Sequence, residues 1–349
     1  MAPHAIASDV HPAAVLYNLA HGFRGTQALL VATELGIADH LAAGPLSAAE
    51  LAMRTATNAD ALHRLMRALC ALGVFVEQAS GCFAHNSVSR LLRSDVEGSF
   101  SAVVQFLASP ARWRCWGSLG DTIRTGEGAT TRVLGTSLFD YYAAHPVQSK
   151  IHDDAMKAMS LDHGSAIVDA IALRAHDVVV DVGGGTGQLL AAILSANPPA
   201  KGILFDLPGV VAHAPSLLSH RNVSDRCAIT SGSFFERVPG SGDVYLLKQV
   251  IHDWDDERAS AILRNCRRAM PEAGRLVVVE RQMPEPGAGN ASAGPFLVDL
   301  EMLVMTPGGR ERTLSGIRAL LANSGFTLHR VAQTASPFCV FEAYSSSST

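Results

Sequence analysis

The chain has 349 residues, the length of two domains or of one large domain with an appendage. Hydrophobic residues make up 48% of it and charged residues 17%, as in a globular protein with a large core and unlike a disordered chain. The formal net charge is −4, from 28 basic and 32 acidic residues. This charge gives no reason to expect nucleic acid or an anionic membrane as a partner.

The cysteines and the apolar segments predict a cytoplasmic protein. Six cysteines lie far apart and form no C-x-x-C pair, so neither a zinc knuckle nor a redox motif is indicated: Cys70, Cys82, Cys115, Cys227, Cys266 and Cys339. At this density we expect reduced, mostly buried thiols. The N-terminal segment has no basic stretch followed by an apolar one, so no signal peptide is expected. Every apolar run is shorter than the roughly 18 residues that suggest a membrane span.

Residues 1–100 read as short helices followed by a β-ribbon, which resembles a winged helix. Ser47 and Glu50 predict a capping box at the start of one helix, and Asn58 can cap the next. The ribbon covers residues 74–86, with its turn at Ser80–Gly81. Winged helices often bind DNA, but this segment holds six arginines and no lysine against eight acidic residues. A duplex-binding face should be basic, so we expect a dimerisation domain.

Residues 101–170 are expected to form a helical connector that contributes to a substrate pocket. The segment is rich in aromatic residues and methionine, most of which we assign to core packing: Phe106, Trp113, Trp116, Phe139, Tyr141, Tyr142, Met156 and Met159. The remainder are candidates to line an apolar pocket for a flat ligand.

Residues 171–349 predict an α/β domain. Short β-branched runs such as "DVVVDV" and "GRLVVVE" alternate with helical patterns such as "DDERASAILRNCRRAM". This alternation is typical of βαβ units and a parallel sheet. The last segment, "TLHRVAQTASPFCVFEAY", predicts two closing antiparallel strands.

A glycine-rich turn joins the first of these strands to a helix. Gly183, Gly185 and Gly187 follow G-x-G-x-G, whereas a dinucleotide fingerprint is G-x-G-x-x-G. Asp181, just before the turn, would repel a pyrophosphate but could accept hydrogen bonds from an ammonium group. Asp206, at the end of the second strand, stands where an acid can hold both hydroxyls of a ribose. The pattern favours S-adenosylmethionine over NAD.

Six motifs, in order, make the chain resemble one family: "DVGGGTG", "FDLPGVV", "GSFFERVPGSGDVYLLKQVIHDWDDE", "ILRNCRRAMPEAGRLVVVE", "DLEMLVMTPGGRERT" and "LLANSGF". It is similar, over nearly its whole length, to the S-adenosylmethionine-dependent O-methyltransferases that act on small phenols in plants and on aromatic antibiotics in bacteria. The resemblance implies a Rossmann-like methyltransferase sheet with a closing antiparallel strand, preceded by a winged-helix dimerisation domain. It also implies a cytoplasmic homodimer that methylates a phenolic, polycyclic secondary metabolite and releases S-adenosylhomocysteine.

The resemblance also implies a cofactor site. The glycines after Asp181 correspond to the loop beside the methionine part of the cofactor, and Asp206 with Leu207 to the ribose site. The family usually has an aspartate beside the adenine where this chain has Ser233, which carries no charge and precedes Phe234. The expected cofactor residues are Asp181, Gly183, Gly185, Gly187, Asp206, Leu207, Ser233, Phe234 and, near the adenine end, Lys248 and Trp254.

His252 follows the fourth strand and corresponds to the family's general base. A phenol of pKa ~10 does not ionise unaided at neutral pH, whereas an imidazole can accept its proton. A carboxylate that fixes the tautomer improves such a base, and the resemblance assigns this role to Glu280 and Glu311.

The remaining site residues concern the acceptor and the absence of a metal. The resemblance places Met159 and Met302 on the two faces of a flat acceptor and lets Asp253 contact it, while Tyr142 and Met305 are further candidate walls. The acidic run with Asp255 and Asp256 could imitate a magnesium site, but its surroundings match the histidine-dependent family. We therefore expect no metal and assign these two acids to the start of a helix.

Two alternatives to the methyltransferase stay open at the level of sequence. One is a homologue that binds S-adenosylmethionine but performs non-methylating chemistry of the hydroxylase or decarboxylase type. The other is a winged-helix regulator that senses a small ligand, which the acidic N-terminal segment and the His252, Glu280 and Glu311 set disfavour. The sequence names neither the acceptor nor the hydroxyl that is methylated.

Overall fold

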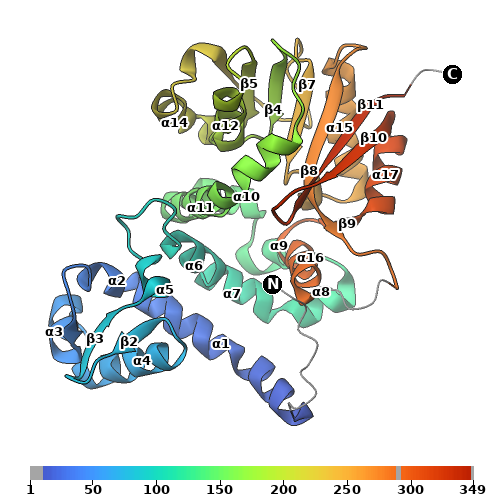
Figure 1. The fold of residues 1–349 in the computed structure, drawn as a ribbon. Coiled ribbons are helices and arrows are strands. Elements are labelled where there is room, and N and C mark those ends of the chain that lie inside the picture. The colour runs from blue at the N-terminus through green and yellow to red at the C-terminus, as the bar shows by residue number, and fades with distance from the viewer. Residues whose placement is uncertain (1–10, 288–291, 347–349) are drawn as a thin grey trace. The chain divides into compact units, whose positions relative to one another are not determined.

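The computed structural model describes residues 11–287 and 292–346, without the side chains of residues 160–162. The described chain forms two compact units (Figure 1). The N-terminal unit comprises residues 11–114 and 145–161, and the C-terminal unit comprises residues 115–144, 162–287 and 292–346. The segment 101–170, expected to be a connector, is thus shared between the units. Residues 1–10, part of the segment in which no signal peptide is expected, lie outside the described residues.

The N-terminal unit has the helices and the ribbon expected for residues 11–100. Ser47 and Glu50 form the predicted capping box, and the Asn58 side chain accepts a hydrogen bond from the Ala61 amide at 3.0 Å. The ribbon strands pair antiparallel in a three-stranded sheet of order β1-β3-β2. The elements are α1 (Pro12–Glu34), α2 (Ile37–His40), β1 (Leu46–Ser47), α3 (Ala48–Thr55), α4 (Ala59–Ala71), β2 (Phe75–Glu77), β3 (Cys82–His85), α5 (Ser87–Arg90) and α6 (Ser101–Leu107).

Two helices continue from one unit into the other, α7 (Pro110–Gly117) and α11 (Pro146–Ala170). Between them the C-terminal unit contains three short helices, α8 (Leu119–Thr125), α9 (Ala129–Leu134) and α10 (Leu138–Ala144). The predicted helical character of this stretch is confirmed.

The C-terminal unit is built on a mixed sheet of order β10-β11-β8-β7-β4-β5-β6, in which the five strands β4 to β8 run parallel to one another. The two last strands close the sheet antiparallel, as predicted. The strands are β4 (Val178–Val182), β5 (Lys201–Asp206), β6 (Cys227–Ser231), β7 (Val244–Lys248), β8 (Arg275–Met283), β10 (Phe326–Gln333) and β11 (Phe338–Ser345), and β9 (Arg312–Thr313) pairs with β8 in parallel.

Helices pack on both faces of this sheet (Figure 1). Alternate residues of β7 serve the two cores: Tyr245 and Leu247 pack with α15 and α17, and Leu246 packs with α12 and α14. A strand buried on both faces explains why "VYLLK" is apolar without alternation. The helical elements are α12 (Gln188–Ala196), α13 (Pro208–Val211), α14 (Ala214–His220), η1 (Ser224–Arg226), η2 (Ile251–Asp253), α15 (Asp256–Ala269), α16 (Ala293–Met305) and α17 (Leu314–Asn323).

The strand order determines where polar residues gather. From β4 the chain moves outward to β5 and β6, then returns to the other side of β4 with β7 and β8. The order therefore reverses beside β4, and ligands of open α/β sheets bind beyond the carboxyl ends of the strands at such a point. The residues that follow β4, β5 and β7 all lie at this edge.

No helix within residues 11–287 and 292–346 combines the length and the apolar character needed to cross a membrane.

Candidate active site

The glycine turn after β4 brings the backbone close to the neighbouring strand. The amide of Gly183 donates to the carbonyl of Phe205 at 2.8 Å, and Gly187, the N-cap of α12, has a φ of 86°. A Cβ on Gly184 would lie 2.6 Å from the carboxyl carbon of Asp181. The glycines therefore permit a left-handed turn over a buried carboxyl group, with the start of α12 directly behind it.

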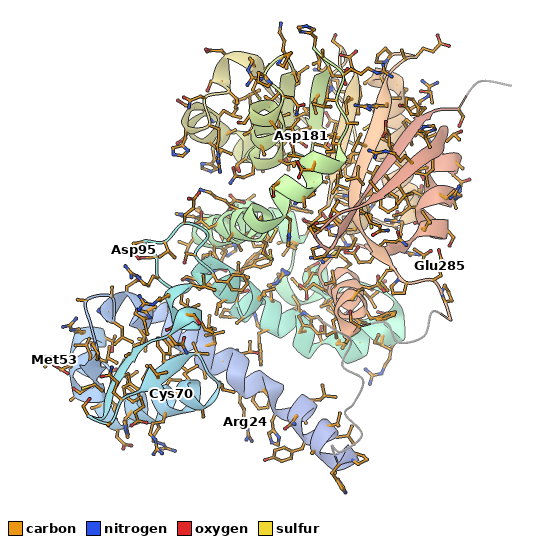
Figure 2. The ribbon with its side chains drawn as sticks, viewed as in Figure 1. Arg24, Met53, Cys70, Asp95, Asp181 and Glu285 are labelled. Carbon is orange, nitrogen blue, oxygen red and sulfur yellow. The ribbon has the colours of Figure 1, made fainter. Side chains whose placement is uncertain are left out.

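Asp181 is almost completely buried beneath this turn, and Figure 2 labels it within the C-terminal unit. Burial, together with the charge of Asp206, raises the pKa of its carboxyl group to about 7, although Lys248 opposes the shift. Its Oδ2 has no hydrogen-bond partner in the described part of the chain. A buried carboxylate oxygen without a partner is costly, and a bound cation would satisfy it.

Asp206 is held in one orientation at the end of β5. Its Oδ2 accepts from the amide of Gly185 at 2.8 Å, and its Oδ1 accepts from the amide of Leu207 at 2.7 Å. A carboxylate oxygen can accept more than one hydrogen bond. The geometry is therefore compatible with the expected ribose contact, while Leu207 beside it is exposed.

An aromatic group lies at the other expected end of the cofactor site. The rings of Phe234 and Phe235 lie 6.2 and 4.7 Å from the indole of Trp254. The Trp254 Nε1 is buried without a partner among the described residues. Ser233 uses its hydroxyl to accept from the Phe235 amide at 3.3 Å.

Asn265, on α15, was not foreseen from the sequence. Its side-chain amide donates to the carbonyls of Phe234 and Phe235 at 2.7 and 2.9 Å and so fixes the loop that follows β6. A buried asparagine on the apolar face of an amphipathic helix was the available signal.

Lys248 ends β7 between two carboxyl groups. Its Nζ donates to the Gln249 side chain at 3.0 Å. Burial lowers the pKa of its ammonium group, and the charges of Asp181 and Glu280 oppose that shift. The charges that raise the pKa of Lys248 come from Asp181 and Glu280, and neither residue is expected beside the adenine. The expected role of Lys248 at the adenine end therefore stays a prediction.

The structure brings His252 together with both expected glutamates. The Nδ1 of His252 lies 2.8 Å from Oε1 of Glu311 and 3.8 Å from Oε2 of Glu280. The other ring nitrogen, Nε2, lies 3.6 Å from a carboxylate oxygen of Asp253. The imidazole is almost buried, and its strongest hydrogen bond is to Glu311.

Glu280 makes a different set of contacts. Its Oε1 accepts from the amides of Val250, Ile251 and His252 at 3.2, 3.1 and 3.3 Å. The carboxylate therefore binds the backbone of the 3₁₀ turn η2, on which His252 is carried, and it contributes negative charge beside the ring. Burial raises the pKa of Glu280, while the charge of His252 opposes that shift.

The pKa of His252 results from opposing effects. Burial lowers it, but the charges of Glu280 and Asp253 and the hydrogen bond to Glu311 together raise it above its ordinary value. The cluster therefore stabilises the imidazolium form. An imidazole in such surroundings is a stronger base than a free one and is protonated over a wider pH range.

The acids after His252 serve the start of α15. Asp255 accepts from the amide of Arg258 at 2.8 Å as an N-cap, and Asp256 pairs with Arg312 at 2.8 Å. The assignment of these acids to a helix start agrees with the first contact, whereas the ion pair with Arg312 was not foreseen. Among the described residues, the group with metal-ligand spacing is His252, Glu280 and Glu311, whose ligand atoms lie within 4.8 Å of one another.

The expected acceptor residues fall into both units. Met159 belongs to the N-terminal unit, whereas Tyr142, Met302, Met305 and Asp253 belong to the C-terminal unit. Met305 is buried in a cluster with Cys115, Ala129 and Val304, so core packing accounts for its position. Met302 is half-buried on α16, and Tyr142 is nearly buried beside Tyr141. Their contact with an acceptor stays a prediction.

The chain matches two family descriptions. Residues 17–95 match the O-methyltransferase dimerisation domain, and residues 116–327 match the O-methyltransferase domain. Together the two matches extend over most of the chain in the order expected from the motifs.

Relatives of known name and structure support the same assignment. The phenazine O-methyltransferase PhzM of Lysobacter antibioticus is 40% identical over 97% of this chain and 97% of its own length. The crystal structure of LaPhzM has a TM-score of 0.91 with 40% identity, over 96% of this chain and 100% of that one. The neocarzinostatin-biosynthesis O-methyltransferase NcsB1 was solved with S-adenosylmethionine and 2-hydroxy-5-methyl naphthoic acid. It is 33% identical, over 92% of this chain and 95% of that one, with a TM-score of 0.79.

The cofactor and the family follow from the matches rather than from the site geometry alone. The cofactor of the family is S-adenosylmethionine, for which the glycine turn and the buried Asp181 provide a fitting site. This chain belongs to the S-adenosylmethionine-dependent O-methyltransferases that carry an N-terminal dimerisation domain.

Proposed function

We propose that the enzyme methylates a phenolic hydroxyl of a polycyclic aromatic secondary metabolite, with His252 as the general base. The observation that carries this proposal is the 2.8 Å contact between His252 Nδ1 and Glu311 Oε1. It commits Nδ1 to a carboxylate and leaves Nε2 as the nitrogen that can accept a proton. One named relative is a phenazine O-methyltransferase and another was solved with a naphthoic acid, which supports the acceptor class.

The chain's own residues divide the binding of the cofactor between them. The unpartnered Oδ2 of Asp181 would accept from the cofactor's ammonium group, and the oriented carboxylate of Asp206 from its ribose hydroxyls. Phe234 and Trp254 would border the adenine. When bound, S-adenosylmethionine supplies an electrophilic sulfonium methyl group.

His252 makes the acceptor oxygen nucleophilic. Neutral His252, with its Nδ1 proton donated to Glu311, takes the phenolic proton at Nε2 as the oxygen–carbon bond forms. The imidazolium that results lies among the carboxylates of Glu280, Glu311 and Asp253, which stabilise its charge. The raised pKa of His252 moves toward the ~10 of an ordinary phenol, so this transfer becomes less uphill.

Dimerisation is the second part of the proposal. The family match supports a homodimer through residues 17–95. Helix α1 carries large apolar side chains that are exposed in a single chain, as expected if a second copy covers them: Leu16, Tyr17, Leu19, Phe23 and Val31.

The six cysteines are free thiols, which supports the expected cytoplasmic location.

A screen of acceptors tests the proposed function. Purified enzyme is incubated with isotopically labelled S-adenosylmethionine and a panel of phenols, naphthols and phenazine alcohols, and the products are identified by mass spectrometry. We expect label on a phenolic oxygen, with larger planar acceptors turned over better than monocyclic ones. Label found only on carboxylate or amine groups would overturn the phenolic assignment.

A further inference from the structure

Arg312 contacts the turn that carries His252. Its side chain is only 5% exposed. The Nη1 group donates to the carbonyl of Ile251 at 2.7 Å, and Nη2 donates to the carbonyl of Trp254 at 2.8 Å. One guanidinium group therefore binds the backbone on both sides of His252.

Other groups also bind this turn. Glu280 Oε1 accepts the three amides from residues 250–252, and the amide of Arg310 donates to the carbonyl of His252 at 2.8 Å. The amides of the turn thus bind a carboxylate on β8, and its carbonyls bind the segment 310–312. With both sets of bonds in place, η2 has little freedom to rotate the imidazole.

The loop before Arg312 can approach the turn because Gly309 has no side chain. A Cβ there would lie 2.5 Å from the His252 carbonyl oxygen and 2.2 Å from the Thr306 hydroxyl. Its own amide donates to that hydroxyl at 2.9 Å. The close approach sets the distance at which Arg310 and Arg312 meet the catalytic turn.

The charge of Arg312 also suits its position. It lies beside His252, Glu280 and Glu311. Several carboxylates surround the imidazole of His252, and Arg312 lowers the pKa of Glu280 against the larger effect of burial. A lysine would supply the charge but not the planar fork that reaches two separate carbonyls and Asp256.

We propose that Arg312 is a positioning residue for methyl transfer: it fixes the backbone of residues 250–254 so that Nε2 of His252 faces the acceptor oxygen. The proposal rests on the proposed role of His252 as base. Arg312 itself binds backbone carbonyls and Asp256, and it acts on the reaction through His252.

The test compares Arg312→Lys with a matched control, Arg275→Lys. Arg275 is similarly buried, with 8% of its side chain exposed, and pairs with Asp177 and Glu342 at the start of β8, away from Glu280. Each variant keeps the positive charge but loses hydrogen bonds that only the guanidinium group can make. We expect both to lower the melting temperature of the full chain.

Only Arg312→Lys should change catalysis. Its kcat should fall by about ten- to hundredfold, because displacement of a reacting group by ~1 Å can cost that much. The KM for the acceptor and the Kd for S-adenosylhomocysteine should change by less than about threefold, since the charge and the binding residues are retained. Hydrogen exchange of the amides in residues 250–254 should accelerate in Arg312→Lys and not in Arg275→Lys.

Three results decide between the possible failures. If Arg312→Lys matches Arg275→Lys in kcat and in hydrogen exchange, while His252→Ala is impaired on the same acceptor, the role of Arg312 is overturned and the base stands. Full activity of His252→Ala overturns the proposed base instead.

If Arg312→Lys does not fold, Asp256→Ala replaces it, because Asp256 is 65% exposed and anchors the outer side of the guanidinium. A two- to fivefold fall in kcat, by an order-of-magnitude expectation for one lost ion pair, supports the proposal, and an unchanged kcat contradicts it.

Discussion

His252 and Glu311 are 59 residues apart in the chain, yet His252 Nδ1 and Glu311 Oε1 lie 2.8 Å apart and are both buried. Glu280 lies near the same ring, but its Oε1 accepts hydrogen bonds from three backbone amides. The two glutamates therefore make different contributions: Glu311 orients the ring, and Glu280 binds the turn and adds charge.

Replacement of each glutamate by glutamine separates these contributions. Glu311→Gln keeps a hydrogen-bond acceptor for Nδ1 but removes its charge, and kcat should fall by about ten- to hundredfold, the equivalent of one hydrogen bond to a charged group. Glu280→Gln keeps an oxygen for the three amides, so its hydrogen exchange over residues 250–252 should resemble the wild type. Steady-state kinetics on a weakly acidic phenol provides the measurement. Equal or larger loss of kcat than in His252→Ala would show that these acids do more than support the base.

Asp181→Asn should stabilise the protein without cofactor and weaken cofactor binding. The pKa of Asp181 is raised to about 7 in the fold, so the folded protein keeps this carboxyl group neutral up to that pH, whereas the unfolded chain ionises it at pH ~4. The stability of the wild type therefore falls as the pH rises from ~4 to about 7. The gain in unfolding free energy over the wild type should therefore be larger at pH 8 than at pH 5, by roughly 2 kcal/mol. Denaturant unfolding at the two pH values tests this prediction, and a gain that is equal at both would refute it.

Calorimetry of Asp181→Asn with S-adenosylhomocysteine should show weaker binding than the wild type at pH 8, whereas unchanged binding would mean that the cation is held elsewhere.

Asp206→Ala tests the ribose contact. Loss of the oriented carboxylate should weaken binding of S-adenosylhomocysteine by about 1–3 kcal/mol, the cost of unpaired polar groups. Met53→Ala serves as a control, because that exposed side chain lies on α3 and is not one of the expected cofactor residues. Isothermal calorimetry measures both, and NAD should show no binding to the wild type. An Asp206→Ala affinity equal to the wild-type value would place the ribose hydroxyls on other groups.

Much of this arrangement was accessible from the sequence because it follows local rules. The capping box of Ser47 and Glu50, the glycine turn before Gly187 and the apolar strand before His252 each depend on a few adjacent residues. The meeting of His252 with Glu280 and Glu311 came from the resemblance to a family, since no local pattern relates positions so far apart.

Other parts of the site depend on packing between distant elements, which cannot be predicted from local patterns in a single sequence. The contacts of Arg312 with Ile251 and Trp254, and of Asn265 with the loop after Ser233, join distant elements through ordinary polar side chains. Met305 illustrates the opposite difficulty: its sulfur could line a pocket or fill a core, and the structure buries it. The unequal use of Glu280 and Glu311 is likewise visible only once the turn at residues 250–252 is folded.

The apolar side chains of α1 predict an obligate dimer. Leu16, Leu19 and Phe23 are between 51% and 75% exposed in one chain, and a second copy would cover them. Sedimentation equilibrium should give twice the chain mass at micromolar concentration, and Phe23→Asp with Leu19→Asp should shift it toward monomer. Met53→Asp is a control, because Met53 is also exposed, at 80%, but lies on α3. A folded wild-type monomer at that concentration would contradict the dimer.

The measurement that tests the central claim most directly is the activity of His252→Ala across acceptors of graded acidity and across pH. In the wild type, the raised pKa of His252 means that the neutral, base-competent imidazole increases with pH, so kcat should rise from pH 6 to well above the ordinary histidine value of ~6.5. In His252→Ala, kcat on a weakly acidic phenol at pH 7 should fall by about 10²–10⁴-fold with cofactor affinity unchanged. The loss should shrink for phenols that are already ionised, and the pH profile of the variant should follow the pKa of the acceptor. Wild-type activity of His252→Ala on a weakly acidic phenol at neutral pH would contradict the account and leave His252 a structural residue.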